Sequence, residues 1–413
     1  MRLVYPFGTL DTPVGDVLHA QDILFQNLAN PAYADVPVLP DLDSIDTFYI
    51  YNRSRIVNLY RKWITLLPTV EPYYAIKCNP DPILLDTLAE CGACFDAASP
   101  AEIDAALQRV PESKIIYANP CKPTHDIKYA SDKAVRLSTF DNENEYDKIA
   151  AASMTRAKVI LRIYANDTSA KCVLSNKYGA MPDEWHRILE YIREQTNLAE
   201  GAEAQAQAQV PEVIGISFHI GSGANDPAAF AQAISAAHGV FGMAIKMGFN
   251  FSVLDIGGGF THDNIERMAN TITTSLEAFK ADYPNVRVIA EPGRYFAESI
   301  ADLYTKIIGV RTRQAEGTRH YWINDSLYGS FNCIMYDHAK PVPISLTLHN
   351  EPKVSSTIWG STCDGMDKII EDAKLPILAI GDWLRWDKMG AYTQAGATHF
   401  NGIPFANIKK FYL

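Results

Sequence analysis

The stretch PYYAIKCNP, residues 72–80, combines aromatic and branched residues with a lysine and a Cys-Asn-Pro turn. Residues 73–77 predict a short strand whose C-terminal end carries the Lys77 ammonium group. A lysine often frames a strand end simply by reaching water or guarding an edge. The meaning of this lysine therefore depends on the residues at the ends of the other strands.

The same pattern recurs: a short apolar strand, then a polar or glycine-rich turn, then a helix. We expect eight strands, at residues 73–77, 93–97, 114–119, 135–140, 158–164, 213–220, 251–257 and 286–293. Residues 100–110 and 226–248 are typical of helices, with Ser99 as an N-cap and a terminal glycine at Gly248. Eight such units over about 250 residues predict an α/β fold with a TIM (β/α)8 barrel. A doubly wound open sheet is the alternative.

The character of the sequence changes near residue 300, where strand-like runs succeed one another without long helices. We therefore expect a barrel domain at residues 45–296 and a C-terminal all-β domain at residues 297–413. Residues 1–44 are expected to form an N-terminal segment that contributes to the β domain. The low-complexity tract 201–209 is predicted to be a flexible insertion, and no catalytic or binding role is assigned to it.

The composition of the chain limits the classes of molecule that it is expected to bind. The formal net charge of −11 disfavours nucleic acid and anionic membranes, and it tolerates a cationic small ligand. Cys91 and Cys94 have CxxC spacing, but no second pair or histidine cluster completes a zinc site, so no metal is expected. Reduced thiols, the absence of an apolar leader and the absence of an 18-residue apolar run predict a cytoplasmic protein.

Chemistry-bearing residues stand where the expected strands end, which is where a TIM barrel builds its active site. They are Lys77, Asp96, Asn119, Arg162, His219, the triplet Gly257–Gly259, Glu291 and Arg294. The triplet can bring backbone N–H groups against an anion, and Arg294 comes after the next strand. Together they match the usual phosphate position of such barrels.

A lysine facing a phosphate site suggests pyridoxal 5′-phosphate, because an amine is the nucleophile that holds the cofactor aldehyde. Glu291 can then keep the pyridine nitrogen protonated, although a salt bridge to Arg294 is the alternative. His219 can stack on the ring, or it can be a core histidine bonded to backbone.

Ten motifs, in order, resemble one family. They are PYYAIKCNPDP, FDAAS, NPCKP, SFHIGSG, DIGGGF, AEPGRYF, YGSFNCIMYDHAKP, STIWGSTCDGMD, GDWLRWDKMGAYT and FNG. Over residues 45–403 the chain is similar to the eukaryotic ornithine decarboxylases, pyridoxal-phosphate enzymes with an alanine-racemase-like fold. Ala97, Ser361 and Met366 depart from the family pattern in ways that should leave the chemistry intact.

The resemblance implies the residue roles. Cofactor binding would involve Lys77, Asp96, Arg162, His219, Ser222, Gly257, Gly258, Gly259, Glu291, Gly293, Arg294 and Tyr392. The substrate would contact Tyr336, Asp337, Cys363, Asp364 and Phe400. The catalytic residues would be Lys77, Cys363, Glu291 and His219, with Cys363 returning a proton to Cα.

The implied reaction is decarboxylation of L-ornithine to putrescine and carbon dioxide in polyamine biosynthesis. In this family Cys363 and Asp364 would reach into the partner's site, which implies an obligate homodimer with shared active sites, and Lys177 would contribute to its interface. Residues 119–150 resemble the antizyme-binding stretch of animal homologues, which leaves room for an antizyme-like regulator. The alternatives are an enzyme of the same fold that acts on lysine, on arginine, on diaminopimelate or on both lysine and ornithine, and a non-catalytic regulatory homologue.

Overall fold

The computed structural model describes residues 46–153, 156–200, 210–315, 317–346 and 353–413. Its described residues group into two compact units. We call the described parts of 49–303, 327–341 and 387–413 the barrel unit, and those of 46–48, 304–326 and 342–386 the sheet unit.

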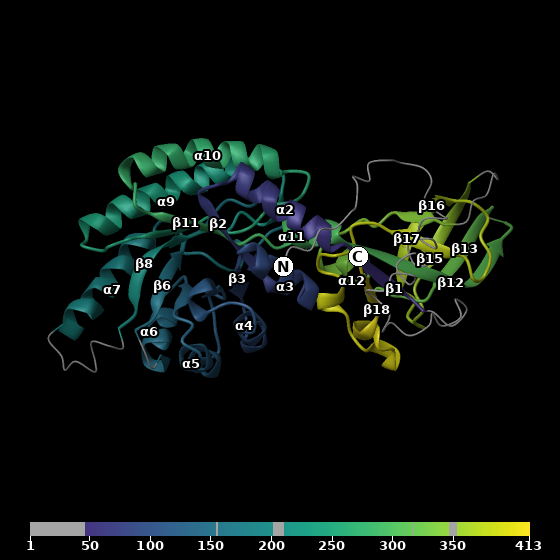
Figure 1. Cartoon of the computed structure of the whole chain (residues 1–413), viewed down its shortest axis with the longest axis horizontal. Helices are drawn as coiled ribbons and strands as arrows, with labels where there is room; N and C mark the ends of the chain where they lie inside the picture. Colours follow the sequence, from purple (N-terminus) through teal and green to yellow (C-terminus); the bar gives the residue numbers. More distant parts are fainter. Residues whose placement is uncertain (1–45, 154–155, 201–209, 316, 347–352) are drawn as a thin grey trace, which may run out of the picture. The chain divides into compact units, whose positions relative to one another are not determined.

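In the described chain, eight parallel strands close into a barrel (Figure 1). They run in the order β2 (Val70–Ala75), β3 (Cys94–Ala97), β4 (Ile115–Tyr117), β5 (Leu137–Phe140), β6 (Lys158–Arg162), β8 (Glu212–Ser217), β10 (Val253–Asp255) and β11 (Arg287–Ala290). The barrel closes because β11 pairs with β2, Val288 lying opposite Val70. This confirms the predicted TIM barrel and excludes the open sheet.

One layer of side chains fills the barrel with a residue from every strand. The layer holds Tyr73, Cys94, Ile116, Leu137, Ile160, Ile214, Val253 and Ile289. Such a layer explains why the strands read as nearly continuous apolar runs, since each strand is covered on both faces.

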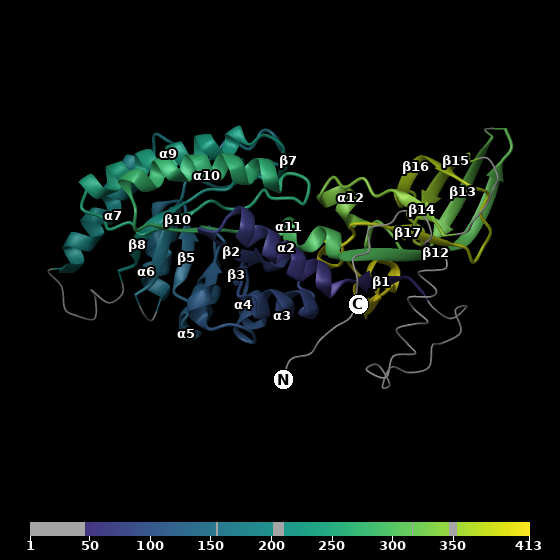
Figure 2. The same ribbon diagram turned by 45° about the horizontal axis from the view of Figure 1, so that its top comes forward.

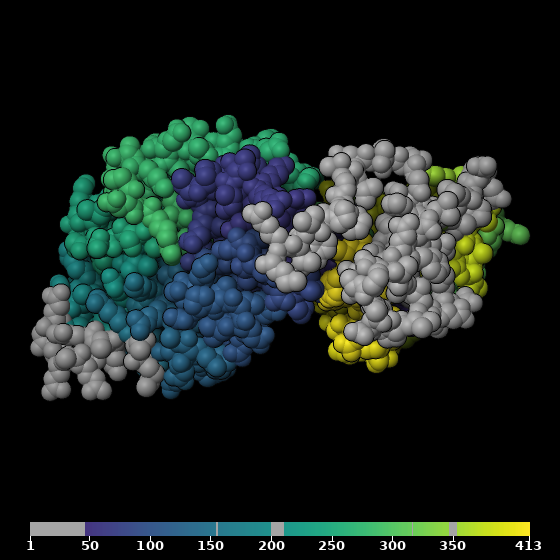
Figure 3. Space-filling model, in the orientation of Figure 1, coloured from purple at the N-terminus to yellow at the C-terminus, as the bar shows by residue number. Residues whose placement is uncertain are grey.

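Helices surround the strands. They are α2 (Arg53–Leu66), α3 (Pro82–Cys91), α4 (Pro100–Leu107), α5 (Thr124–Asp132), α6 (Glu143–Ala152), α7 (Trp185–Glu200), α9 (Ala228–Lys246), α10 (Ile265–Asp282) and α11 (Arg294–Ala297). Ser99 caps α4 as predicted, since its side chain accepts a hydrogen bond from the Glu102 N–H. Figure 3 shows the purple α2 beside the green α10, where Lys62 and Glu266 form an ion pair of 2.8 Å.

Helix α9 is long and apolar enough to cross a membrane, judged by length and composition alone. It packs beside α10 and β8, and buries Phe230, Ile234 and Phe241. We therefore interpret α9 as a core helix of the barrel unit.

One predicted strand ends earlier than expected. Strand β2 stops at Ala75, and Ile76–Cys78 form a 3-10 turn closed by a 3.1 Å hydrogen bond from the Asn79 N–H to the Ile76 carbonyl. Lys77 therefore lies in the turn after the strand and not on the strand itself.

The sheet unit contains a mixed β-sheet (Figure 2). Its strands run in the order β14 (Pro343–Ser345), β17 (Trp383–Trp386), β12 (Ala301–Arg313), β13 (Thr318–Ile323), β15 (Val354–Trp359) and β16 (Lys368–Leu375). Strands β13 and β15 are parallel, whereas β15 and β16 form an antiparallel pair. Strand β1 (Phe48–Tyr51) pairs with β12 and with β18 (Lys409–Tyr412).

The two units interleave along the chain, which differs from the single boundary expected near residue 296. Residues 387–413 group with the barrel unit because the chain hydrogen-bonds back to it. The Tyr392 N–H donates to the Cys78 carbonyl at 2.9 Å, and the Met389 N–H donates to the Ala301 carbonyl at 2.8 Å. The expected N-terminal segment 1–44 and the tract 201–209 lie outside the described residues, so the role given to that segment remains a proposal.

Candidate active site

A cavity of about 610 Å³ opens where the barrel strands end. Its lining includes Lys77, Asn119, Arg162, His219, Ser222, Gly258, Gly259, Glu291, Gly293, Arg294, Tyr336, Asp337 and Tyr392. Most residues predicted at the strand ends therefore meet in one place, as the barrel topology requires.

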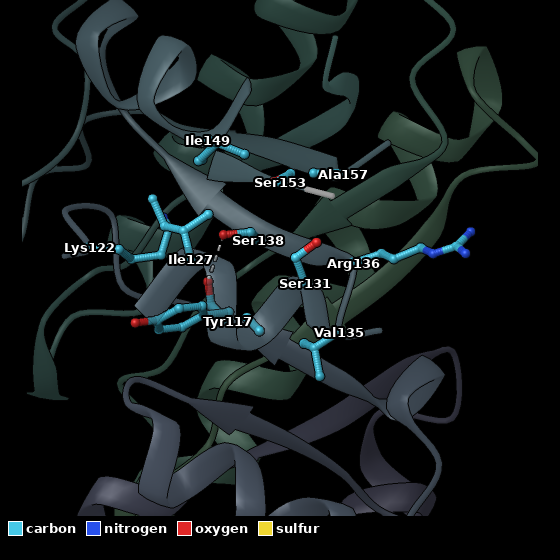
Figure 4. A pocket seen from close by; sticks show the side chains of 11 residues that line it. Tyr117, Lys122, Ile127, Ser131, Val135, Arg136, Ser138, Ile149, Ser153 and Ala157 are labelled. Atoms are coloured by element: carbon cyan, nitrogen blue, oxygen red, sulfur yellow. Dashed lines mark hydrogen bonds between the residues drawn. The ribbon is translucent and has the colours of Figure 1, made fainter. Parts of the chain in front are cut away.

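A second cavity, shown in Figure 4, is much smaller, about 20 Å³. It is bordered by Tyr117, Lys122 and Ser138, and the Ser138 hydroxyl donates to the Tyr117 carbonyl at 3.2 Å. This volume holds about one water molecule, so it is no candidate for a cofactor or a substrate.

Lys77 faces a buried carboxylate. Its Nζ lies 3.6 Å from Oδ2 of Asp96, the third residue of β3. The Lys77 side chain is 47% accessible because it borders the cavity, whereas Asp96 is 1% exposed. Asp96, and then Glu291, raise the pKa of Lys77 although the surrounding protein opposes its charge. The lysine is therefore held as an ammonium group.

His219 is neutral. Burial, together with the nearby cations Arg162 and Lys77, holds its pKa well below the usual range. Its Nδ1 accepts a hydrogen bond from the Gly221 N–H at 2.9 Å, which places the ring proton on Nε2. Gly258 lies against this ring, because a Cβ atom there would come within 2.7 Å of Nε2. The imidazole thus presents an uncharged ring at the cavity wall.

Glu291 has a carboxyl neighbour that was not predicted from the sequence. Burial, and then Asp255 and Asp96, raise the pKa of Glu291 well above its usual range. Burial also raises the pKa of Asp255 to about 7, although the Gly257 N–H donates to its Oδ1 at 2.8 Å. Because two buried carboxylates side by side are costly, the raised pKa values favour a proton on one of the two groups. A carboxylate that ends a buried strand, two residues before a glycine triplet, was the available signal.

The glycine-rich turns and Arg294 form a cradle beside this pair. Gly257 and Gly259 have φ values of 64° and 109°, which favour glycine. The Arg294 side chain is 5% exposed and donates to the Ser222 hydroxyl at 3.2 Å and to Glu298 at 3.4 Å. Its guanidinium carbon lies 5.3 Å from the centre of the Tyr392 ring. These donors are suited to an anion.

Asp337 enters the cavity from the segment after α12 (Asn332–Tyr336). Its Oδ1 accepts a hydrogen bond from Arg294, and its Oδ2 lies 3.6 Å from Lys171 Nζ. Cys172, which was not predicted from the sequence, also lines the cavity, with its Sγ 3.6 Å from Asp337 Oδ1.

Tyr336 and Phe400, which were also predicted to contact the substrate, differ from each other in exposure and in position. Tyr336 lines the cavity and is 77% exposed. Phe400 is not among the described residues that line the cavity; its ring stacks on Tyr328 with centroids 4.0 Å apart.

Cys363 and Asp364 belong to the sheet unit. They lie between β15 and β16, where Cys363 is exposed and Asp364 Oδ1 accepts a hydrogen bond from the Met366 N–H at 3.0 Å.

Comparison with known proteins gives consistent matches. Residues 53–298 match the family model described as the pyridoxal-binding domain of pyridoxal-dependent decarboxylases. The chain is 40% identical to ornithine decarboxylase from Mus musculus, over 94% of this chain and 84% of that protein. It is 39% identical to antizyme inhibitor 2 from Xenopus laevis, over 87% of this chain and 79% of that protein.

Among solved structures, the arginine decarboxylase of Paramecium bursaria Chlorella virus aligns with a TM-score of 0.83. The two chains are 36% identical, and the alignment covers 95% of this chain and 100% of the viral one. The 610 Å³ cavity lies mostly within the matched segment 53–298.

Proposed function

The chain belongs to the pyridoxal-dependent decarboxylases, and from that premise we propose that it converts L-ornithine to putrescine and carbon dioxide. The observation that carries the proposal is one cavity in which a lysine amine, a buried carboxyl pair and an arginine cradle meet. The similarity to the mouse ornithine decarboxylase over 94% of the chain supports the choice of substrate.

The residues present fit pyridoxal 5′-phosphate. The buried Nε of Arg294 has no hydrogen-bond acceptor among the described residues, and it lies in the cradle where a phosphate would need donors. Gly258 leaves the space beside His219 and Glu291 that a side chain would fill. The neutral ring of His219 suits stacking on a flat heteroaromatic ring.

We assign the holding residues accordingly. Lys77 carries the amine that bonds the cofactor aldehyde, with Asp96 and Arg162 beside it. Ser222, the glycines 257–259, Gly293, Arg294 and Tyr392 hold the phosphate, and Glu291 faces the pyridine nitrogen. When bound, the cofactor supplies the electron sink for the charge left at Cα when carbon dioxide departs.

The pair formed by Asp255 and Glu291 gives a physical basis for the role of Glu291. A pair of buried carboxyl groups of which one holds a proton carries a single negative charge, which complements a protonated pyridine nitrogen. A mixed pair can adjust its proton without placing two bare charges in the interior.

Asp337 and Asp364 are the proposed partners of the distal substrate ammonium. Asp337 Oδ2 accepts no hydrogen bond from the described residues, and Lys171 Nζ approaches it at 3.6 Å. We assign this oxygen to the substrate ammonium, because charge-assisted hydrogen bonds select a cationic side chain over a neutral one. Tyr336 and Phe400 complete the proposed substrate site, and Cys363 returns the proton to Cα.

The direct test is release of carbon dioxide from L-ornithine by the purified protein, with putrescine as the second product. Lys77→Ala should abolish turnover and the cofactor absorbance that depends on its bond to the protein. A Lys77→Ala protein with full activity would refute the assignment. Lys128→Ala on α5 changes a lysine outside the cavity and serves as the matched control.

A related substrate is the second candidate, because the chain also resembles a viral arginine decarboxylase. Lysine differs from ornithine by one methylene, and such a difference in a pocket is worth about 1–3 kcal/mol. Parallel assays with ornithine, lysine and arginine at equal concentration decide the preference. A higher kcat/KM for lysine or arginine would replace ornithine in the proposal.

The likeness to antizyme inhibitor 2 from Xenopus laevis raises the case of a non-catalytic regulatory protein. Retention of Lys77, Glu291, Arg294, Cys363 and Asp364 supports catalysis. A purified protein that remained colourless with added pyridoxal phosphate would favour the regulatory alternative.

We further propose a cytoplasmic homodimer whose two sites each take Cys363 and Asp364 from the partner, with Lys177 at the interface. The exposure of Tyr336 (77%) and Met366 (66%) supports an interface at these residues. Mixing Lys77→Ala protein with Cys363→Ala protein should restore putrescine formation, because a mixed dimer has one intact site. An antizyme-like regulator at residues 119–150 is a further proposed partner, testable by pull-down with an antizyme.

A further inference from the structure

The segment between β15 and β16, residues 360–367, carries the two residues proposed to serve the partner's site. We call it the 360–367 loop. Its last residue, Asp367, is 1% exposed. Asp367 Oδ2 accepts hydrogen bonds from the Thr362 N–H at 3.0 Å, the Thr362 hydroxyl at 2.6 Å and the Ser326 hydroxyl at 3.0 Å. One buried oxygen thus accepts three hydrogen bonds.

The backbone of the loop closes around the same residue. The Gly360 N–H donates to the Asp367 carbonyl at 2.8 Å, and the Asp367 N–H donates to the Asp364 carbonyl at 3.1 Å. Gly360 lies directly on the carboxylate, since a Cβ atom there would overlap it. The backbone of Asp367 is therefore hydrogen-bonded both to the first residue of the loop and to Asp364.

A second attachment ties the loop to the end of β13. The Ser361 N–H donates to the Asp325 carbonyl at 2.9 Å, next to the Ser326 hydroxyl that reaches Asp367. Hydrogen bonds to a buried carboxylate are charge-assisted, and leaving their donors unpaired is costly. The shape of the loop is therefore set by Asp367.

We propose that Asp367 is the positioning residue for Cys363 and Asp364. It holds the loop in the conformation in which the thiol meets Cα and the carboxylate meets the distal ammonium, without touching substrate or cofactor itself. The inference rests on the proposed function, because it takes the roles of Cys363 and Asp364 from there.

The first test compares Asp367→Asn with Asp372→Asn in the holoenzyme. The amide keeps the shape but replaces one carboxylate oxygen with a donor, so the three donors around Oδ2 lose a charged acceptor. Asp372 is an exposed residue of the same hairpin that contacts Ser355 and Lys374, and its variant serves as the control. We expect kcat/KM to fall about 100-fold for Asp367→Asn, because a displacement of about 1 Å costs that much, and to stay unchanged for Asp372→Asn.

The second readout separates positioning from general damage. A proton delivered to the cofactor instead of Cα leaves, after hydrolysis, an aldehyde in place of the diamine, with the nitrogen retained on the cofactor. Asp367→Asn should raise the aldehyde-to-putrescine ratio toward that of Cys363→Ala, while pyridoxal phosphate affinity stays at the wild-type value. A merely destabilised protein would lose cofactor affinity and keep the product ratio.

Thr362 provides a second pair of variants in case Asp367→Asn does not fold. Thr362→Val removes the hydroxyl donor at nearly constant shape, and Thr362→Ser retains it. We expect the valine variant to raise the aldehyde ratio and the serine variant to behave like the wild type. Equal behaviour of these two variants would overturn the proposal.

Three further outcomes test the positioning role of Asp367. An unchanged product ratio in Asp367→Asn, with Cys363→Ala showing the increase, would overturn the positioning role and leave the proposed function intact. An unchanged ratio in Cys363→Ala would refute the proton-return role itself. Sedimentation of Asp367→Asn as a monomer would assign the loss to assembly and overturn the proposal.

Discussion

The Nζ of Lys77 lies 3.6 Å from Oδ2 of Asp96, a carboxylate that is 1% exposed. Asp96 is the main cause of the raised pKa of Lys77. An amine must lose its proton before it can attack an aldehyde. If Lys77 has its proposed role as the cofactor-binding amine, we expect the pair to set the pH at which the protein takes up its cofactor.

Asp96→Asn should shift the pH dependence of cofactor capture to lower pH, because the amine loses the charge that stabilises its protonated form. Stopped-flow absorbance of the cofactor-stripped protein mixed with pyridoxal phosphate, at a series of pH values, measures this. Asp132→Asn, at an exposed residue of α5, is the control and should leave the profile unchanged. An unshifted profile in Asp96→Asn would show that the ion pair does not set the amine's protonation.

Gly258→Ala should weaken cofactor binding without unfolding the barrel. Its Cβ would lie 2.7 Å from His219 Nε2 and 2.9 Å from the Glu291 carbonyl oxygen, so the imidazole must move. Overpacking of this kind costs about 1–3 kcal/mol, which corresponds to a loss of roughly 10-fold or more in affinity.

Gly239→Ala provides the matched control. Gly239 lies in α9, and within the described chain, apart from the backbone of its own helix and its chain neighbours, no atom lies within 4 Å of the position that its Cβ would take. The change should raise helix stability by up to about 1 kcal/mol and leave affinity unchanged. Titration with pyridoxal phosphate and thermal denaturation check both variants; equal affinities would contradict the close approach at Gly258.

Asp255→Asn should flatten the pH dependence of stability. The folded-state pKa of Asp255 is raised from 3.8 to about 7, so the folded state holds a proton that the unfolded chain has released. The associated stability is full below 3.8 and is lost as the pH rises through about 7. Its slope reaches at most about 1.4 kcal/mol per pH unit for one proton.

Urea denaturation of the cofactor-stripped protein between pH 4 and pH 8 measures this slope. The wild type should lose stability from this carboxyl group as the pH rises, and Asp255→Asn should lose less. A variant with a steeper decline than the wild type would assign the proton to another group.

Arg294→Met should destabilise the fold and weaken cofactor binding together. Arg294 and Asp337 form a buried pair with side chains 5% and 6% exposed. Removing one partner of such a pair leaves the other charge buried without a partner, which lowers the free energy of unfolding by about 3–5 kcal/mol.

The double variant Arg294→Met/Asp337→Asn should recover part of this stability, since no bare carboxylate remains. Cofactor affinity should stay low in both, because Arg294, the proposed phosphate donor, is absent. Denaturation midpoints of the two singles and the double form the cycle, and strictly additive losses would mean that the pair is not coupled.

The barrel could be predicted because each strand is a short apolar run and each strand is followed by a polar or glycine-rich turn. The residues after the strands could be placed together because parallel strands point their carboxyl ends to one edge. Lys77, His219, Glu291 and Arg294 were predicted in this way, and all of them line the cavity. Asp255 was missed, although it ends its strand two residues before the glycine triplet, because one carboxylate in an apolar run does not show that a second carboxyl group lies beside it in space.

Local pattern thus determined the fold and most of the cavity wall, since strand order and spacing follow from short-range preferences. Tertiary structure alone decided the charges: the neutral His219, the raised pKa values of Asp255 and Glu291, and the ammonium form of Lys77. These states depend on burial and on neighbours tens to hundreds of residues away. Electrostatic energy depends on distance in space, and a sequence gives only distance along the chain.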